Sequence, residues 1–351
     1  YFPANSGAST NKIKTITGFA LDINEFTYDA FGRLKTEKTT IDGVAHEFIN
    51  TYNAHNLTFR SYPDLFGLYY NYDANGYLIE IKDQANSIKL FETVSMNGLG
   101  QYKSYKLGNT KTSTNTYYFG FPTNYSTTGI QNLSMAWNYA NGNLNSRTDV
   151  LKSKTENFAY DGLDRLTGSS GTGIATTSMV YGPNGNISQK SDAGTYDYHN
   201  AKFNAVDYIT GPLNIPNNLQ TITYTSYAQP NLILQGSDRV EYTYGADEQR
   251  IKAITKVSNT VTNTRYYFGD YEKDITNGIT KHIYYISAGD GLVAIAVREN
   301  NANIFHYVYT DHLGSIVALT NNIGTITSEQ NFDAWGRKRN PTNWTYASIP
   351  S

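Results

Sequence analysis

Short stretches rich in Thr, Tyr, Ile and Val alternate along the chain with runs of Gly, Asn and Asp. Residues 221–225, 282–286 and 305–309 are typical stretches, and β-branched and aromatic residues of this kind favour strands. No segment carries a long apolar stripe at helical spacing. We therefore predict an all-β chain built from antiparallel hairpins stacked along one direction.

The turns between these stretches repeat one pattern: an aromatic residue, Asp or Asn, two turn residues, Gly, a polar residue and an aliphatic residue. Because Asp or Asn can bond to the backbone two residues on and Gly supplies a positive φ, each copy predicts a hairpin turn. Copies that follow one another directly start 20 to 24 residues apart, which leaves room for two strands per copy. Copies start at Tyr28, Tyr52, Tyr72, Met96, Tyr139, Tyr160, Tyr181 and Tyr244. The residues that define the clearest copies are Tyr28, Asp29, Gly32, Tyr72, Asp73, Gly76, Tyr160, Asp161, Tyr181 and Gly185.

Four segments break the repeat: residues 1–11, 121–129, 169–177 and 211–218. Their Gly, Pro, Ser and Asn content predicts loops. Because the repeat resumes after each segment, we expect one continuous array with surface excursions and no separate domains joined by linkers.

The composition narrows the possible functions. Charged residues make up 17 %, aromatic residues 14 %, and the net charge is -2, so the chain has neither the signature of disorder nor the basic footprint of a nucleic-acid binder. The absence of Cys excludes disulfides, Cys-ligated zinc, iron–sulfur clusters and a thiol nucleophile. No window approaches the ~20 apolar residues of a membrane span. Since the chain starts at Tyr1 without a signal peptide, we expect it to be part of a longer protein.

Asp311 and His312 are an adjacent acid and imidazole pair. A hydrolase would use His312 as a base oriented by Asp311, but no Ser in a nucleophile-elbow context follows. The favoured interpretation is structural: Asp311 caps a turn in which Gly314 takes the special φ. His46, His55, His199, His282 and His306 lack metal-ligand spacing and are interpreted as strand or turn residues.

Three further features allow a binding role. Residues 337–339 read Arg-Lys-Arg, which is shorter than a typical phosphate- or membrane-binding run, so we expect a solvated turn. Residues 270–274 alternate carboxylates but lack the glycine and final Glu of a calcium loop. The 31 tyrosines would suit sugar or quaternary-ammonium stacking, but with 3 Trp in the chain we favour half-buried structural tyrosines whose hydroxyls reach backbone or water.

The repeated Tyr-Asp turns resemble the YD repeats of RHS (rearrangement hotspot) proteins, which include toxin-complex C components, wall-associated RHS proteins and teneurins. Residues 307–316, with Asp311, His312 and Gly314, and residues 332–337, with Asp333, Trp335 and Gly336, resemble the RHS repeat-associated core. The resemblance implies a sheet that spirals into a hollow shell around a C-terminal polypeptide, commonly a toxin. The self-cleaving segment that closes the core in better-known members does not occur up to Ser351.

We therefore expect a YD-repeat array over residues 1–250 that continues into the first part of the core over residues 251–351. The favoured function is a non-catalytic shell of a secreted or cell-surface bacterial protein, with no cofactor and no metal. Its partners would be its own C-terminal effector and export machinery. The alternative is a surface adhesin that binds glycans through the same hairpins, and a β-propeller enzyme is a third interpretation.

Overall fold

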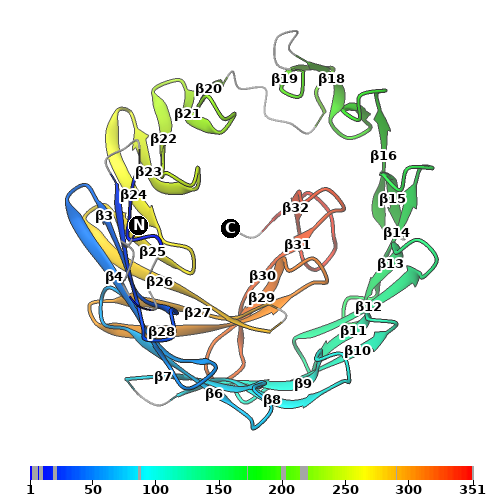
Figure 1. Ribbon diagram of the computed structural model, residues 1–351. Helices are drawn as coiled ribbons and strands as arrows, with labels where there is room; N and C mark the ends of the chain where they lie inside the picture. The colour runs from blue at the N-terminus through cyan, green and yellow to red at the C-terminus, as the bar shows by residue number, and fades with distance from the viewer. Residues whose placement is uncertain are drawn as a thin grey trace. The chain divides into compact units, whose positions relative to one another are not determined.

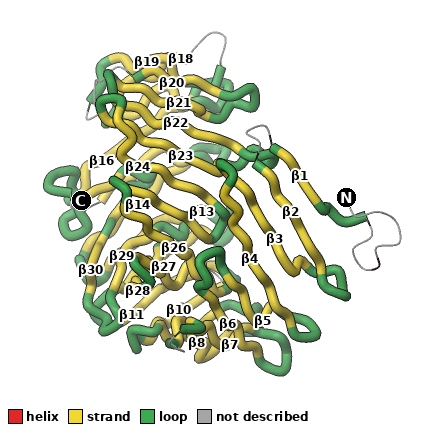
Figure 2. The backbone as a smooth tube through the Cα atoms, turned by 90° about the vertical axis from the view of Figure 1, so that its left-hand side faces the viewer, coloured by secondary structure: helices red, strands yellow, loops and turns green. Residues whose placement is uncertain are grey.

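The computed structural model describes residues 1, 7, 11–18, 22–85, 88–171, 173–198, 203–213, 220–289 and 291–349. Most of residues 1–11 and 211–218, which we predicted as loops, and His199 lie outside the described residues. The described part of the chain consists of β-strands joined by turns and loops, without an α-helix (Figure 2). The predicted all-β fold is confirmed.

The chain divides into two compact units. Unit 1 comprises Tyr1–Val94, Lys106–Thr110 and Leu219–Tyr307, and unit 2 comprises Ser95–Tyr105, Lys111–Asn218 and Val308–Ser351. Strands β8 (Lys89–Met96), β9 (Tyr102–Leu107) and β28 (Ala302–Thr310) run across a unit boundary along the chain.

Unit 1 contains two meanders in which each strand pairs antiparallel with its neighbour in sequence. The first meander consists of β1 (Thr15–Thr17), β2 (Ile23–Tyr28), β3 (Leu34–Ile41), β4 (Val44–Tyr52), β5 (Leu57–Ser61), β6 (Gly67–Tyr72) and β7 (Leu78–Asp83). The second consists of β20 (Thr221–Tyr224), β21 (Pro230–Gln235), β22 (Asp238–Tyr244), β23 (Arg250–Val257), β24 (Thr260–Tyr267), β25 (Tyr271–Thr276), β26 (Ile279–Ala288) and β27 (Gly291–Glu299).

Unit 2 contains one long meander and two short strand pairs (Figure 1). The meander consists of β10 (Thr112–Tyr118), β11 (Phe121–Thr127), β12 (Gln131–Asn138), β13 (Asn143–Asp149), β14 (Lys154–Tyr160), β15 (Leu166–Gly171), β16 (Ile174–Tyr181), β17 (Ile187–Lys190), β18 (Gly194–Tyr198) and β19 (Val206–Thr210). The short pairs are β29 (Ile316–Thr320) with β30 (Ile326–Glu329), and β31 (Asn331–Phe332) with β32 (Lys338–Arg339).

Two of the predicted loops are strands. Residues 121–129 contain β11, and residues 169–177 contain the end of β15 and the start of β16. The prediction was wrong because polar residues here satisfy their backbone groups by pairing with neighbouring strands. Hydroxyl pairs across strands replace apolar contacts, as between Ser113 and Thr127 at 2.7 Å and between Ser169 and Thr177 at 2.9 Å.

The repeated turn is a type I turn followed by a residue of positive φ. In the first copy the Asp29 carboxylate accepts the amides of Phe31 and Arg33, each at 2.9 Å, and Gly32 has φ 77°. A shift of register lies next to the tyrosine in the copies at Tyr28, Tyr52, Tyr72, Tyr160, Tyr181 and Tyr244. At Tyr28, Tyr72, Tyr160, Tyr181 and Tyr244 the turn is a three-residue hairpin loop with a G1-type bulge. The copy at Tyr52 has a shorter loop, in which the Asn53 amide donates to the Asn56 carbonyl.

In five copies of the turn, and at Tyr198, a tyrosine hydroxyl bonds an earlier segment of the chain. These six hydroxyls donate to backbone carbonyls at 2.7–3.0 Å. The donors are Tyr28, Tyr52, Tyr160, Tyr181, Tyr198 and Tyr244, and the acceptors are Ile13, Leu34, Leu144, Leu166, Ile187 and Pro230. Arg33 and Arg165 lie over the rings of Tyr52 and Tyr181, the tyrosines of the next copy, at 4.4 Å. The turns recur about every 21 residues, and this spacing brings the tyrosine hydroxyls next to the backbone carbonyls that accept from them.

Candidate functional site

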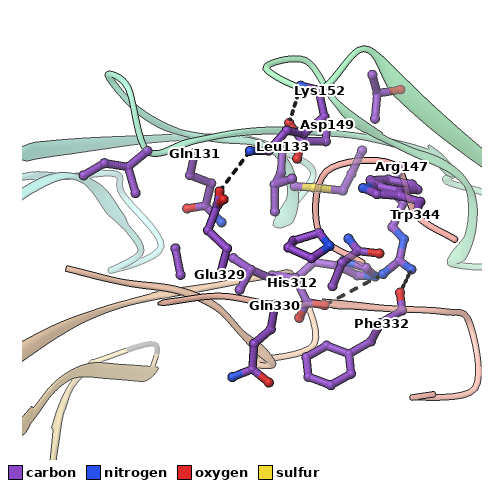
Figure 3. Close-up of a pocket in the computed structure, with 18 residues that line it drawn as sticks. Gln131, Leu133, Arg147, Asp149, Lys152, His312, Glu329, Gln330, Phe332 and Trp344 are labelled. Atoms are coloured by element: carbon purple, nitrogen blue, oxygen red, sulfur yellow. Dashed lines mark hydrogen bonds and ion pairs between the residues drawn. The ribbon is translucent and has the colours of Figure 1, made fainter. Parts of the chain in front are cut away.

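The candidate site lies in unit 2, where the segment after residue 308 packs on β12, β13 and β14 (Figure 3). We call it the anchor site and define it by Arg147, Glu156, Asp311, Arg339 and Trp344. Asp311 belongs to the first block that resembles the RHS core, and Phe332 of the second block lines the space beside it. Its geometry therefore decides whether those blocks perform chemistry or hold the chain in place.

Glu156 on β14 is the centre of the anchor site, and its side chain has 0 % exposure. Its cross-strand partner on β13 is Arg147, which donates to the carboxylate from Nε at 3.0 Å and from Nη2 at 2.8 Å. Arg339 on β32, with 1 % side-chain exposure, donates from Nη1 at 3.2 Å and from Nη2 at 2.7 Å. Burial acts to raise the pKa of Glu156, but Arg147 and Arg339 hold it below its ordinary value. A buried carboxylate thus receives one guanidinium from the neighbouring strand and one from a residue 183 positions further along the chain.

Arg147 also contacts the C-terminal segment directly. Its Nη2 donates to the backbone carbonyl of Phe332, and its Nη1 lies 3.8 Å from Asp311 Oδ2 (Figure 3). The buried Trp344 ring lies beneath both guanidiniums, 4.4 Å from that of Arg339 and 5.9 Å from that of Arg147. Cation–π contacts of desolvated Arg add to the ion pairs.

Asp311 and His312 do not form a catalytic pair in this arrangement. Asp311 Oδ1 accepts the amides of Leu313 and Ser315, each at 2.9 Å, and Gly314 has φ 83°. The His312 ring packs edge-on against Trp137, with centroids 5.9 Å apart. Burial and the charge of Arg147 lower the pKa of His312, although Asp311 opposes them. Asp311 is therefore engaged by its own turn and by Arg147.

The space left at the anchor site is too small for a substrate. The cavity has a volume of about 40 Å³, enough for a few water molecules, whereas small-molecule sites span roughly 300–1,000 Å³. At its edge Lys152 Nζ bonds Glu329 Oε1 at 3.0 Å (Figure 3). The groups that line it are therefore arranged for packing.

The second core-like block repeats the turn of the YD copies. Asp333 Oδ1 accepts the amides of Trp335 and Arg337, each at 2.9 Å, and Gly336 has φ 83°. Asp333 Oδ2 accepts the hydroxyl of Tyr346 at 2.7 Å, and Arg337 lies 3.9 Å above the Tyr346 ring. The pKa of Tyr346 is raised by burial and by this hydrogen bond.

The expectation of a solvated turn at residues 337–339 was wrong. Arg339 is buried against Glu156, and Arg337 lies 3.5 Å from Asp192. Isolated charges in a strand give no sign of burial, so Arg147 and Glu156 were not singled out in the sequence. The available signal was weak: each has a neutral residue on either side in a chain poor in charge.

The alternating carboxylates at residues 270–274 are engaged by neighbouring side chains, and Asp274 and Glu272 share Arg265. Asp270 binds Arg60 and Tyr62, Asp274 binds Arg265 and Asn263, and Glu272 lies 3.5 Å from Arg265. Among the described residues, no group of three or more His, Asp or Glu is placed to hold a metal ion. Within the same residues, no helix has the length and apolar character needed to cross a membrane.

Comparison with known proteins gives curated relatives over part of the chain. The tRNA3(Ser)-specific nuclease WapA of Bacillus spizizenii is 34 % identical over 128 residues, which is 34 % of this chain and 5 % of that protein. The tRNA nuclease WapA of Bacillus subtilis is 32 % identical over the same length and the same shares. This chain thus matches about a twentieth of these relatives. No family model matches the sequence.

Solved structures share the fold over nearly the whole chain. The crystal structure of TcdB2-TccC3-Cdc42 has a TM-score of 0.79 at 14 % identity and covers 99 % of this chain and 22 % of its own. The Photorhabdus luminescens Tc holotoxin pore with the mutation TccC3-D651A has a TM-score of 0.75 at 14 % identity and covers 97 % and 21 %.

The fold therefore defines a class of all-β chains built from stacked antiparallel hairpins, which this chain shares with the toxin-complex structures. This shared fold, the repeated Tyr-Asp turns and the similarity to WapA over 128 residues agree with the resemblance of the chain to RHS/YD-repeat proteins.

Proposed function

We propose that this chain is a non-catalytic part of the shell of an RHS-family toxin, and that the shell encloses an effector polypeptide encoded after Ser351. One observation carries the proposal: a fully buried carboxylate, Glu156, fixes the end of the described chain to the repeat sheet through Arg339. A shell that passes its chain on to an enclosed effector needs such a fixed exit point. The 40 Å³ cavity beside it fits a packing role.

The relatives support the effector part of the proposal. The WapA proteins are named as tRNA nucleases, and the matched region is 5 % of each, so the named activity belongs to proteins far longer than the match. By analogy, residues 1–250 form the array, residues 251–351 begin the core, and the effector follows. The shell would be secreted or lie at the cell surface, and export machinery would be a further partner.

The turn residues named from the sequence have a structural role in this proposal. Tyr160 and Asp161 join one hairpin to the next, and Asp311, Asp333 and their turns set the path of the core segment. None of them is assigned to catalysis.

Protease protection tests the proposal. In the protein expressed from the complete reading frame, the segment after residue 351 should resist a protease that rapidly digests the same segment expressed alone. The variant Glu156→Gln should become more sensitive at residues 331–349. Equal digestion of the downstream segment in both contexts would contradict the shell.

A glycan-binding adhesin remains the second candidate, because one observation favours it. Tyr118, Phe119 and Tyr139 in unit 2 are exposed by 53 %, 78 % and 42 %, with ring centroids of Tyr118 4.4 Å from Phe119 and 5.0 Å from Tyr139. Exposed aromatic rings of this kind can stack on sugars. Binding on a glycan array that is abolished by Tyr118→Ala with Phe119→Ala would favour the adhesin over the shell.

A further inference from the structure

A second, larger cavity lies in unit 1, away from the anchor site. Its volume is about 520 Å³, and it lies among β2–β5 and the turns that precede β23 and follow β24. The pairing register brings Asn24 opposite Thr39 and Glu37 opposite Phe48, so these side chains share one face of the sheet. Asp22, one residue before β2, lies on the same face and lines the cavity.

The cavity wall carries more negative than positive charge. Four carboxylates, from Asp22, Glu37, Asp247 and Asp270, and two guanidiniums, from Arg60 and Arg250, line it. Two of the carboxylates are engaged. Asp270 binds Arg60 at 3.1 Å and the hydroxyl of Tyr62 at 2.8 Å, and Asp247 Oδ1 accepts the amide of Gln249 at 3.0 Å.

Asp22 is the residue that points to a ligand. It has 1 % exposure, and neither of its carboxylate oxygens has a hydrogen-bond partner among the described residues. An ionised carboxylate buried without a partner is energetically costly, and proteins rarely keep one unless a cation or donor completes it. The Glu37 carboxylate likewise has no hydrogen bond or ion pair from the described residues. Burial raises the pKa of Glu37, and Asp270 and Asp247 raise it further against the opposing effect of Arg60.

A glycine of the repeat leaves room for the Asp22 carboxylate. Asp follows the tyrosine in three of the eight copies, but after Tyr244, as after Tyr181, the residue is Gly, and a Cβ at Gly245 would lie 3.3 Å from Asp22 Oδ2. An Asp at this position, as in the copy at Tyr28, would bring a further carboxylate against Asp22. In this copy the carboxylate that accepts a turn amide is that of Asp247, two residues after Gly245.

We propose that this cavity binds an alkylammonium group, whose charge is neutralised by Asp22 and Glu37 and whose methylenes pack on Phe48 and Phe268. Aromatic rings beside carboxylates suit a primary amine on an alkyl chain. A metal ion is less well matched, because no three carboxylates or imidazoles among the described residues are placed to share one. The amine can come from a free diamine or from a lysine side chain of a polypeptide. The inference does not depend on the shell function.

Isothermal titration calorimetry on the 351-residue chain tests this inference, with three probes. Cadaverine represents the free diamine, Nα-acetyl-lysine methylamide represents the polypeptide side chain, and the norleucine analogue lacks the charge. At least one amine should bind saturably and the norleucine analogue should not. Asp22→Asn should weaken amine binding by at least about tenfold. Glu37→Gln, at a half-buried strand position, provides a second variant should Asp22→Asn fail to fold.

The control variant is Asp207→Asn, which removes an exposed carboxylate of unit 2 and should leave the affinity unchanged. Binding of cadaverine alone would identify a free amine as the ligand, and binding of the lysine derivative would identify a polypeptide. Unchanged affinity in Glu37→Gln and Asp22→Asn, or no saturable binding at millimolar amine, would overturn the proposal. Binding of calcium that depends on Asp22, without amine binding, would also overturn it in favour of a metal site.

Discussion

Removing the charge of Glu156 should release the C-terminal segment from unit 2. Glu156→Gln keeps the shape of the side chain but removes the anion that Arg147 and Arg339 share. The Arg339 side chain, which is 1 % exposed, then keeps a buried charge without this anion. Breaking a buried ion pair by removing one partner costs about 3–5 kcal/mol. Since 1.4 kcal/mol is a factor of ten, the local opening equilibrium should shift by about 10²–10³-fold or more.

Hydrogen–deuterium exchange followed by mass spectrometry measures this opening locally. Peptides covering residues 331–349 should exchange much faster in Glu156→Gln, whereas peptides from β3 and β4 of unit 1 should keep their rates. The matched control is Glu329→Gln, which breaks the pair with Lys152 on the same segment. That pair is partly exposed, at 24 % and 26 %, and surface pairs of this kind contribute about 0–1 kcal/mol.

The reasoning would be refuted if Glu156→Gln left exchange at residues 331–349 unchanged, or if Glu329→Gln had an equal effect. The pH dependence gives a second check on the same residue. The pKa of Glu156 is lowered in the folded protein from an ordinary value of 4.5, so its stabilisation is complete above that pH. It should be lost as the pH falls below 4.5 and through the folded pKa, and this loss should be absent in Glu156→Gln.

Three other measurements test the account of the fold. Tyr160→Phe loses the hydrogen bond at 3.0 Å to the preceding hairpin and should lower the free energy of unfolding by about 1 kcal/mol, whereas the exposed control Tyr77→Phe should be neutral in urea titrations. A Cβ at Gly314 would meet open space, but Gly314 has φ 83°, so Gly314→Ala should lower the free energy of unfolding by about 1 kcal/mol. The control Gly98→Ala, at a position without a positive φ, should leave it unchanged. Equal effects of the two variants would contradict the turn geometry. Burial lowers the pKa of His46 from 6.5 to about 4, so stability should decline as the pH falls from 6.5 towards 4, and His46→Phe should flatten that part of the profile.

The all-β fold was predictable because each turn is encoded locally. An Asp that caps the turn and a Gly of positive φ lie within four residues of each other, as in Asp29 and Gly32, so the pattern alone indicates a hairpin. The strand β11 was missed because its Pro, Asn, Ser and Thr residues are stabilised by pairing with β10 and β12, which a local pattern does not report.

The anchor site could be predicted only in part. The turns at Asp311 and Asp333 are local and were recognised as motifs. The pairing of Glu156 with Arg339 joins residues 183 positions apart, and neither residue has a neighbour in sequence that marks it as buried. Long-range pairing of single charges becomes visible only when the strands are placed together. The unpaired carboxylate of Asp22 is hidden from sequence for the same reason.

Electron cryomicroscopy of the protein expressed from the complete reading frame tests the central claim most directly. A non-catalytic RHS shell predicts a closed cavity with density for the downstream polypeptide inside it, and residues 308–349 fixed to β13 and β14 through Glu156. An open sheet with the downstream polypeptide folded outside it would contradict the claim.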